Sequence, residues 1–234
     1  MPQDFWIEEY RKKAALKDPV AQSGRGNQFD AVEFIYVAKQ TLELLDVQPE
    51  HEVLDVGCAN GLLDILLSAC CRNVLAIEPV EELVELARKN LADCPNTRAD
   101  VGHGAEVPAE DASFDRVLVW GMVQLIGPEE VKNMFAELNR VTRPGGRILI
   151  GSIPDGHKRD AFLIPYIEDV RKAEHLSEEK KQEIIDRNQN AHWYTPEELT
   201  EWWEALGGSA QQHSLPASDP NSKDRYHLVL KCAE

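Results

Sequence analysis

Short apolar segments alternate with longer helix-like segments from about residue 52 to residue 151, and this alternation constrains the fold more than any other feature. The apolar segments predict strands at 52–56, 74–77, 97–101, 114–120 and 147–151. The segments between them predict helices at 62–71, 80–92 and 128–141. Strands that alternate with helices form right-handed βαβ units and a parallel sheet. We therefore expect an α/β fold with a doubly wound, Rossmann-like, mostly parallel sheet.

Three segments fall outside this alternation. Residues 1–30 predict an amphipathic helix and a polar loop that form a cap, and the charged residues 155–192 predict an inserted helical lid. After the lid, Thr195–Glu198 has the pattern of a capping box that starts a helix. Two strands separated by a polar loop then predict a C-terminal antiparallel hairpin at the sheet edge. The expected core therefore comprises residues 31–154 and 193–234.

Composition restricts the partners. The net charge of −16 disfavours a broad nucleic-acid-binding surface, which needs clustered Lys and Arg. No segment approaches the ~20 apolar residues of a membrane helix, and the N-terminus lacks the pattern of a secretion signal. The five cysteines show no metal-ligand spacing. We expect a cytoplasmic protein, monomeric or homodimeric, with no nucleic-acid, membrane or metal partner.

The segment Val53–Gly61 (VLDVGCANG) carries the strongest functional signal. A buried strand enters a turn in which Gly57 and Gly61 let the backbone approach a ligand, and a helix N-terminus follows. Glu78 ends the next strand, where a carboxylate can accept hydrogen bonds from both ribose hydroxyls of a nucleoside. Turn, strand and acid together indicate a nucleoside-containing cofactor.

Four blocks occur in order along the chain: DVGCANG, AIEP, SFDRVLVW and RPGGRILI. In order and spacing they resemble the class I S-adenosylmethionine-dependent methyltransferase family, closely over residues 47–152. The resemblance is to the subgroup that acts on small molecules, including quinones, sugars and secondary metabolites. It implies S-adenosylmethionine as cofactor and S-adenosylhomocysteine as product.

The resemblance also assigns cofactor contacts. It implies that Asp55 organises the glycine turn and receives the methionine ammonium, with the Gly57 carbonyl as a second partner. Glu78 would hold the ribose, and Pro79 and Val80 would pack on the adenine.

Further contacts are implied outside the turn. The segment of Gly104, Ala105 and Glu106 would meet the adenine edge through main-chain groups, because His103-Gly104 stands where the family often has Asp. Trp120, which ends the fourth predicted strand, is a candidate for the cofactor site or for the core. Arg25 could close over the methionine carboxylate or remain an exposed linker residue.

The acceptor should face the ends of the fourth and fifth strands. Met122 and Gln124 follow the fourth strand and Ser152 follows the fifth, so they are candidate acceptor contacts, as is Tyr194 near the lid. Methyl transfer from a sulfonium is an in-line displacement, for which the protein mainly supplies alignment. No Asp, Asn or Glu cluster with metal spacing follows the fourth strand, so we expect no magnesium-dependent mechanism.

A base is needed only where the acceptor atom must lose a proton. His157 and His192 bracket the predicted lid, so they are the candidate catalytic bases, with His192 favoured. The sequence thus predicts S-adenosylmethionine-dependent methyl transfer to a small molecule, with oxygen as the favoured acceptor atom.

Other functions stay open. An RNA or protein methyltransferase is one alternative, and a catalytically silent S-adenosylmethionine-binding partner subunit is another. An NAD-dependent dehydrogenase is disfavoured, because Cys58, Ala59 and Asn60 separate the two glycines and the GxGxxG spacing is absent. The identity of the acceptor is not encoded in any of these motifs.

Overall fold

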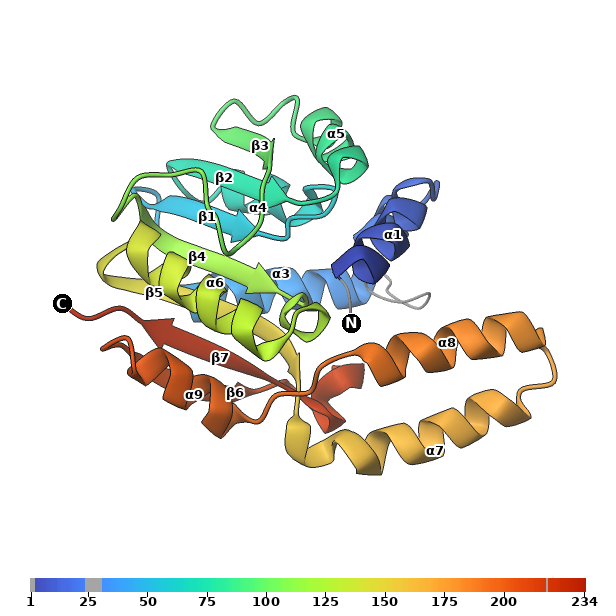
Figure 1. Ribbon diagram of the computed structural model, residues 1–234. Helices are drawn as coiled ribbons and strands as arrows, with labels where there is room; N and C mark the ends of the chain where they lie inside the picture. The colour runs from blue at the N-terminus through green and yellow to red at the C-terminus, as the bar shows by residue number, and fades with distance from the viewer. Residues whose placement is uncertain (1–2, 24–30, 218) are drawn as a thin grey trace.

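Seven strands form one mixed sheet in the computed structural model, which describes residues 3–23, 31–217 and 219–234 (Figure 1). Their order is β3–β2–β1–β4–β5–β7–β6. The strands are β1 Glu52–Val56, β2 Asn73–Glu78, β3 Thr97–Val101, β4 Phe114–Trp120, β5 Thr142–Pro154, β6 Ser209–Ser214 and β7 Arg225–Lys231. β1 to β5 pair in parallel, whereas β7 runs antiparallel to both β5 and β6. The predicted Rossmann-like sheet with a C-terminal antiparallel hairpin is confirmed.

The order of the strands positions the site. From β1 the chain builds outward to β2 and β3, and then returns to add β4 and β5 on the other side of β1. The strand order therefore reverses between β1 and β4, and ligands of such sheets bind at the carboxyl ends of the strands at this point.

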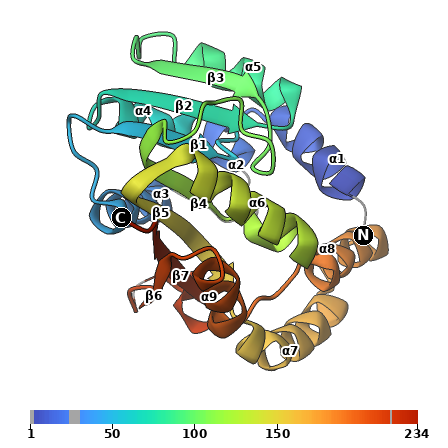
Figure 2. The same cartoon turned by 60° about the vertical axis from the view of Figure 1, so that its left-hand side comes forward.

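Helices cover both faces of the sheet. The structure has α1 Gln3–Ala14, α2 Pro19–Gln22, α3 Ala31–Leu45, α4 Leu62–Ser68, α5 Glu81–Asn90, α6 Pro128–Val141, α7 Arg159–Lys172, α8 Glu178–Asn190 and α9 Pro196–Glu204. Short 3-10 turns lie at η1 Val123–Leu125, η2 Gly156–Lys158 and η3 Pro220–Lys223. α3, α4 and α5 pack on one face, and α6 and α9 pack on the other (Figure 2).

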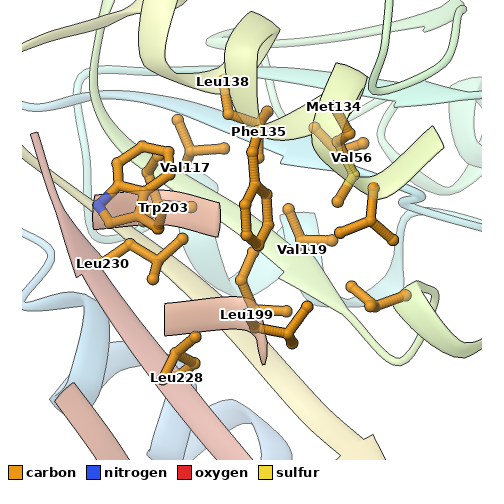
Figure 3. Packing of buried hydrophobic residues seen from close by; sticks show 14 of the residues in the cluster. Val56, Val117, Val119, Met134, Phe135, Leu138, Leu199, Trp203, Leu228 and Leu230 are labelled. Carbon is orange, nitrogen blue, oxygen red and sulfur yellow. The ribbon is translucent and has the colours of Figure 1, made fainter. Parts of the chain in front are cut away.

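The α6 face holds the largest apolar core (Figure 3). Residues spaced three and four apart on α6 point at the sheet, among them Val131, Phe135 and Leu138, and each is fully buried. The Phe135 ring meets Trp203 of α9 edge to face, with 5.7 Å between ring centroids. Burial of one such side chain contributes about 1.5–3 kcal/mol, so this layer fixes the sheet whose edge carries the site.

The chain segment 155–192 forms a helical hairpin of α7 and α8, which extends beyond the sheet (Figure 1). Its two ends meet: Asp155 and Tyr194 form a β-bridge, and Gly156 N donates to Tyr194 O at 3.0 Å. The arrowheads of β1 and β4 point toward the side on which this hairpin and α1 lie (Figure 1). The helical character of the segment is as predicted, while its role as a lid and the division into cap, core and lid stay predictions.

The N-terminal segment lies against the glycine turn. The first 20 residues were expected to form one helix, but the structure divides them into α1 and α2, because Asp18 accepts from Val20 N and caps α2 with Pro19 at its first position. α1 packs on α5, where Arg11 pairs with Glu82 at 2.8 Å. In both views α1 also lies beside α8 (Figures 1 and 2).

Strand β5 is longer than predicted. It begins at Thr142, whereas the sequence predicted a strand only over 147–151. Gly145 supplies a left-handed residue (φ +70°), and the pairing with β4 shifts register between Phe114 and Arg116, so the added residues form an irregular start of the strand. None of the described helices is long and apolar enough to cross a membrane.

Candidate cofactor and acceptor site

The turn after β1 is built from left-handed residues. Gly57 and Gly61 have φ values of +81° and +76°, and Ala59 between them has φ +51°. A Cβ on Gly61 would lie 3.0 Å from Leu91 Cδ1 and 3.1 Å from Ala87 Cβ, so only glycine lets α4 start this close to α5. Ala59 pays a strain of about 1–2 kcal/mol that glycine would not. The backbone is thereby folded tightly around the carboxyl end of β1.

Glu78 ties this turn to the next strand. Its carboxylate accepts from Ala59 N and from Val80 N, each at 3.1 Å, and the residue is 5% exposed. Burial raises the pKa of Glu78 to about 7, against the opposing effect of the two amide hydrogen bonds. The side chain therefore sits at the end of β2, where the sequence predicted a ribose ligand, and at present holds the two loops together.

Asp55 on β1 and Asp64 on α4 lie beside Glu78. They are 3% and 0% exposed, their carboxyls are close neighbours, and neither side-chain oxygen of Asp64 has a hydrogen-bond partner among the described residues. Burial, followed by the charge of Asp64, raises the pKa of Asp55 well above its usual value, and burial also raises the pKa of Asp64. We call Asp55, Asp64 and Glu78 the buried acid cluster.

No Lys or Arg among the described residues forms an ion pair with the buried acid cluster. Buried carboxylates are costly unless they are paired or neutralised. S-adenosylmethionine carries a sulfonium and an ammonium, so the residues present fit this cofactor.

The predicted adenine contacts flank the cluster. Pro79 and Val80 follow Glu78 directly, and Val80 is 2% exposed. Val80 forms a buried cluster with Ala59 and Leu83, against which Ile7 and Tyr10 of α1 pack.

The segment after β3 approaches from the other side. Gly102 N donates to Glu78 O at 3.1 Å, and Gly104 packs so closely on Val56 and Met134 that a Cβ there would lie within 3.0 Å of both side chains. Ala105 and Glu106 are exposed. The structure therefore brings the Gly104–Glu106 segment to the end of β2.

On the acceptor side, Met122 covers the turn, with its Sδ 3.4 Å from the position of a Cβ on Gly57. Gln124 and Ser152 are brought together by a residue that sequence reasoning missed, Arg225. Its Nη1 donates to Gln124 Oε1 at 3.0 Å and to Ser152 O at 2.8 Å. Ser152 is buried and left-handed (φ +59°), a conformation that a non-glycine residue adopts only when its surroundings hold it.

A second missed residue is His227. The Ser152 amide donates to its Nδ1 at 2.9 Å, its Nε2 lies 2.6 Å from Gln40 Oε1, and its ring centroid is 4.9 Å from that of Trp120. His227 belongs to the predicted terminal hairpin, which the sequence alone did not bring to the acceptor side. The direction of β7 was the missing signal, since an antiparallel strand begins at the edge where its parallel neighbours end.

Trp120 packs among β4, β5 and β7: a Cβ on Gly151 would clash with its ring, and it contacts the buried cluster around α3 and α4. Tyr194 is 3% exposed, and its hydroxyl donates to Ile126 O at 2.6 Å. In this structure the hydroxyl is thus engaged inside the core. Arg25 lies outside the described residues.

The two candidate bases differ in environment. His192 is half-buried, its amide donates to Gln124 O at 2.8 Å, and burial lowers its pKa. His157 is 61% exposed, and its Nε2 lies 2.8 Å from Glu197 Oε2, which raises its pKa through the hydrogen bond and the charge. A neutral imidazole is the form that accepts a proton, so the environment of His192 suits a base better.

Across residues 3–23, 31–217 and 219–234, no group of His, Cys, Asp and Glu is arranged to hold a metal ion.

Comparison with known proteins agrees with this geometry. The profile of a family described as "Methyltransferase domain" matches residues 53–146. A protein-L-isoaspartate O-methyltransferase of Myxococcus xanthus is 30% identical over 163 residues, which cover 69% of this chain and 71% of the relative. The chain belongs to the class I S-adenosylmethionine-dependent methyltransferase family. A second relative of the same description, from Rhodopseudomonas palustris, is 31% identical over 121 residues, and this match spans about half of it (55%).

Solved methyltransferase structures share the fold. The N-methyltransferase NodS of Bradyrhizobium japonicum, in complex with S-adenosylhomocysteine, aligns with a TM-score of 0.70 at 13% identity, covering 97% of this chain and 98% of NodS. A geranyl diphosphate methyltransferase in complex with GPP and sinefungin aligns with a TM-score of 0.66 at 13% identity, covering 98% and 99%. Both matches extend beyond the sheet to nearly the whole chain.

Proposed function

We propose that the protein transfers the methyl group of S-adenosylmethionine to a small-molecule acceptor, with oxygen as the acceptor atom. The observation that carries this proposal is the buried acid cluster at the glycine turn, which has no basic partner among the described residues. A cationic nucleoside cofactor supplies the missing positive charge. Asp55 would receive its ammonium, and Glu78 would exchange main-chain amides for ribose hydroxyls.

The chain's own residues would mainly align the reactants. S-adenosylmethionine supplies, when bound, an electrophilic methyl group on sulfur. The acceptor oxygen forms the new C–O bond as the C–S bond breaks, and its proton passes to a base. Met122 over Gly57 and Gln124 beside Ser152 would hold the acceptor in line, and His192 would take the proton.

Three further observations favour a small acceptor. The net charge of −16 opposes the phosphate backbone of a nucleic acid. The α7–α8 hairpin and α1 lie on the carboxyl side of the sheet and would limit the size of what can reach it (Figure 1). The geranyl diphosphate methyltransferase, whose fold is similar over nearly the whole chain, acts by its name on a small molecule.

Ligand-dependent unfolding tests the cofactor. S-adenosylhomocysteine at 100 times its dissociation constant should stabilise the native state by about 2.7 kcal/mol, and NAD at the same concentration should not. A mass-labelled methyl group from S-adenosylmethionine should then appear on a member of a metabolite library. Stabilisation by NAD alone would overturn the proposal, and cofactor binding without transfer to any acceptor would favour a silent binding subunit.

A protein carboxylate is a second candidate acceptor, because the two relatives described above are protein-L-isoaspartate O-methyltransferases. A carboxylate has already lost its proton, so this reaction would need no base. The comparison to make is methyl transfer to an isoaspartyl peptide and to the same peptide with normal aspartate. Transfer to the isoaspartyl peptide alone would replace the small-molecule proposal.

A further inference from the structure

Asp64 has no part in the function proposed so far, yet it is among the most buried residues of the site. It lies in the first turn of α4 and is 0% exposed. A carboxylate at this position can cap its helix, but neither side-chain oxygen of Asp64 has a hydrogen-bond partner among the described residues. The buried Asp64 carboxyl instead neighbours the Asp55 carboxyl on β1.

The contact between these two carboxyls requires a proton. No N–H or O–H group of another described residue donates to the Asp64 oxygens. Two ionised carboxylates can only accept hydrogen bonds, so Asp55 and Asp64 are hydrogen-bonded only while at least one of them is protonated. The pair therefore behaves as one titrating unit.

The surroundings strengthen this requirement. The groups that face the pair are the Glu78 carboxyl at the end of β2 and the Cys58 thiol in the turn, and both are buried. Neither can supply positive charge. Ionisation of both aspartates would place two or three negative charges together in a buried site, which burial opposes strongly.

We propose that Asp64 is a positioning residue that shares one proton with Asp55 and thereby sets the orientation and charge of the carboxylate that receives the cofactor ammonium. This inference rests on the proposed function. With one proton on Asp64, its O–H donates to one oxygen of Asp55 and leaves the other oxygen to accept from the ligand. The pair then carries one negative charge, which matches the single positive charge of the ammonium.

Cofactor binding should consequently release protons. Burial raises the pKa values of both aspartates, so the unliganded pair keeps its protons to a higher pH than exposed carboxyls do. A bound ammonium favours the form with one proton, and the excess proton leaves to solvent. Affinity should therefore increase with pH, by at most about tenfold per pH unit for release of one proton.

The test is isothermal titration of the full-length protein with S-adenosylhomocysteine between pH 6 and pH 7.5, in two buffers of different ionisation enthalpy. The wild-type protein should release protons and bind more tightly as pH rises. In Asp64→Asn an amide N–H donates permanently to Asp55, so the slope and the number of protons released should both fall, and binding at pH 6 should be tighter than in the wild type. Asp93→Asn, the same change at an exposed position, should behave as the wild type.

Asp64→Ala adds a separate readout. It removes the partner of Asp55. The affinity for S-adenosylhomocysteine should therefore fall by a similar factor at every pH, with its dependence on pH unchanged. Should this variant not fold, the comparison of wild type with Asp64→Asn still decides the question. An equal pH slope and equal proton release in those two proteins would overturn the role of Asp64, whereas no binding of S-adenosylhomocysteine to the wild type would overturn the proposed function itself.

Discussion

Replacement of Glu78 by Gln should remove a pH dependence of stability that the unliganded protein owes to this carboxyl. The carboxyl has a pKa of about 7 in the native state against 4.5 for an ordinary Glu, and burial is the main cause. The native state therefore binds a proton more tightly than the unfolded state does. The resulting contribution to stability is fully present below pH 4.5 and is lost as pH rises from 4.5 through 7.

The magnitude follows from the size of the shift. One pKa unit corresponds to 1.36 kcal/mol, so the difference between 4.5 and about 7 amounts to about 3 kcal/mol. Glu78→Gln keeps the shape of the side chain but cannot titrate. The unfolding free energy of the variant minus that of the wild type should thus rise by about 3 kcal/mol between pH 4.5 and pH 8. This holds whether the variant is more or less stable than the wild type at pH 4.5.

Urea denaturation of both proteins at these two pH values measures this difference. The double comparison cancels the titration of groups distant from Glu78 and the pH-independent difference between the two side chains. A relative stability that stays constant within 1 kcal/mol would refute the argument that Glu78 is destabilised by burial. It would also weaken the argument from the buried acid cluster for a cationic cofactor. In the same variant, the affinity for S-adenosylhomocysteine should fall, because an amide can accept only one of the two ribose hydrogen bonds as well as a carboxylate does.

Three further outcomes are expected. Residues 155–192 and α1 should gain hydrogen-exchange protection when S-adenosylhomocysteine and an acceptor bind; uniformly strong protection in the free protein would make them fixed walls instead of a cover. If the acceptor is a hydroxyl, His192→Ala or His157→Ala should lower single-turnover methyl transfer by ~10²–10⁴-fold with cofactor affinity nearly unchanged, and unaltered rates in both would overturn the assignment of the base to these two residues. Asn60→Ala removes hydrogen bonds to Pro19 O (2.8 Å) and Gln22 Oε1 (3.0 Å). Hydrogen exchange in α2 should accelerate, and the free energy of unfolding should fall by about 1–3 kcal/mol. Unchanged exchange would show that this contact does not hold the N-terminal segment in place.

Much of the fold could be predicted because its signals are local. The strand before Gly57, the capped helix after Thr195 and the terminal hairpin each follow from residues adjacent in sequence, and the structure contains all three. The break between α1 and α2 could also have been predicted, since Asp18-Pro19 is a start signal for a new helix as well as an end signal for the old one.

The acceptor side was less predictable because it depends on contacts distant in sequence. Arg225 reaches Gln124 and Ser152 only because β7 returns antiparallel beside β5. The sequence predicted the hairpin but not the neighbour with which it would pair. Asp64 had a local signal that was overlooked: a single acid in the apolar run LLDILLS, on the helix face shared with the buried Leu67.

The two ends of the α7–α8 hairpin are bonded to each other, and this contact lets the segment between them vary in evolution. The polypeptide leaves β5 after Pro154 and returns beside its end at Tyr194, where Tyr194 N donates to Pro154 O at 3.2 Å. Everything between these points is attached at this one place, so its length can vary without shifting the register of any strand. Longer excursions cost little, since each doubling of a loop adds only about 0.6 kcal/mol of closure entropy. Exchange of this one segment between relatives should therefore transfer acceptor preference, while the part of the chain that binds the methyl donor stays the same.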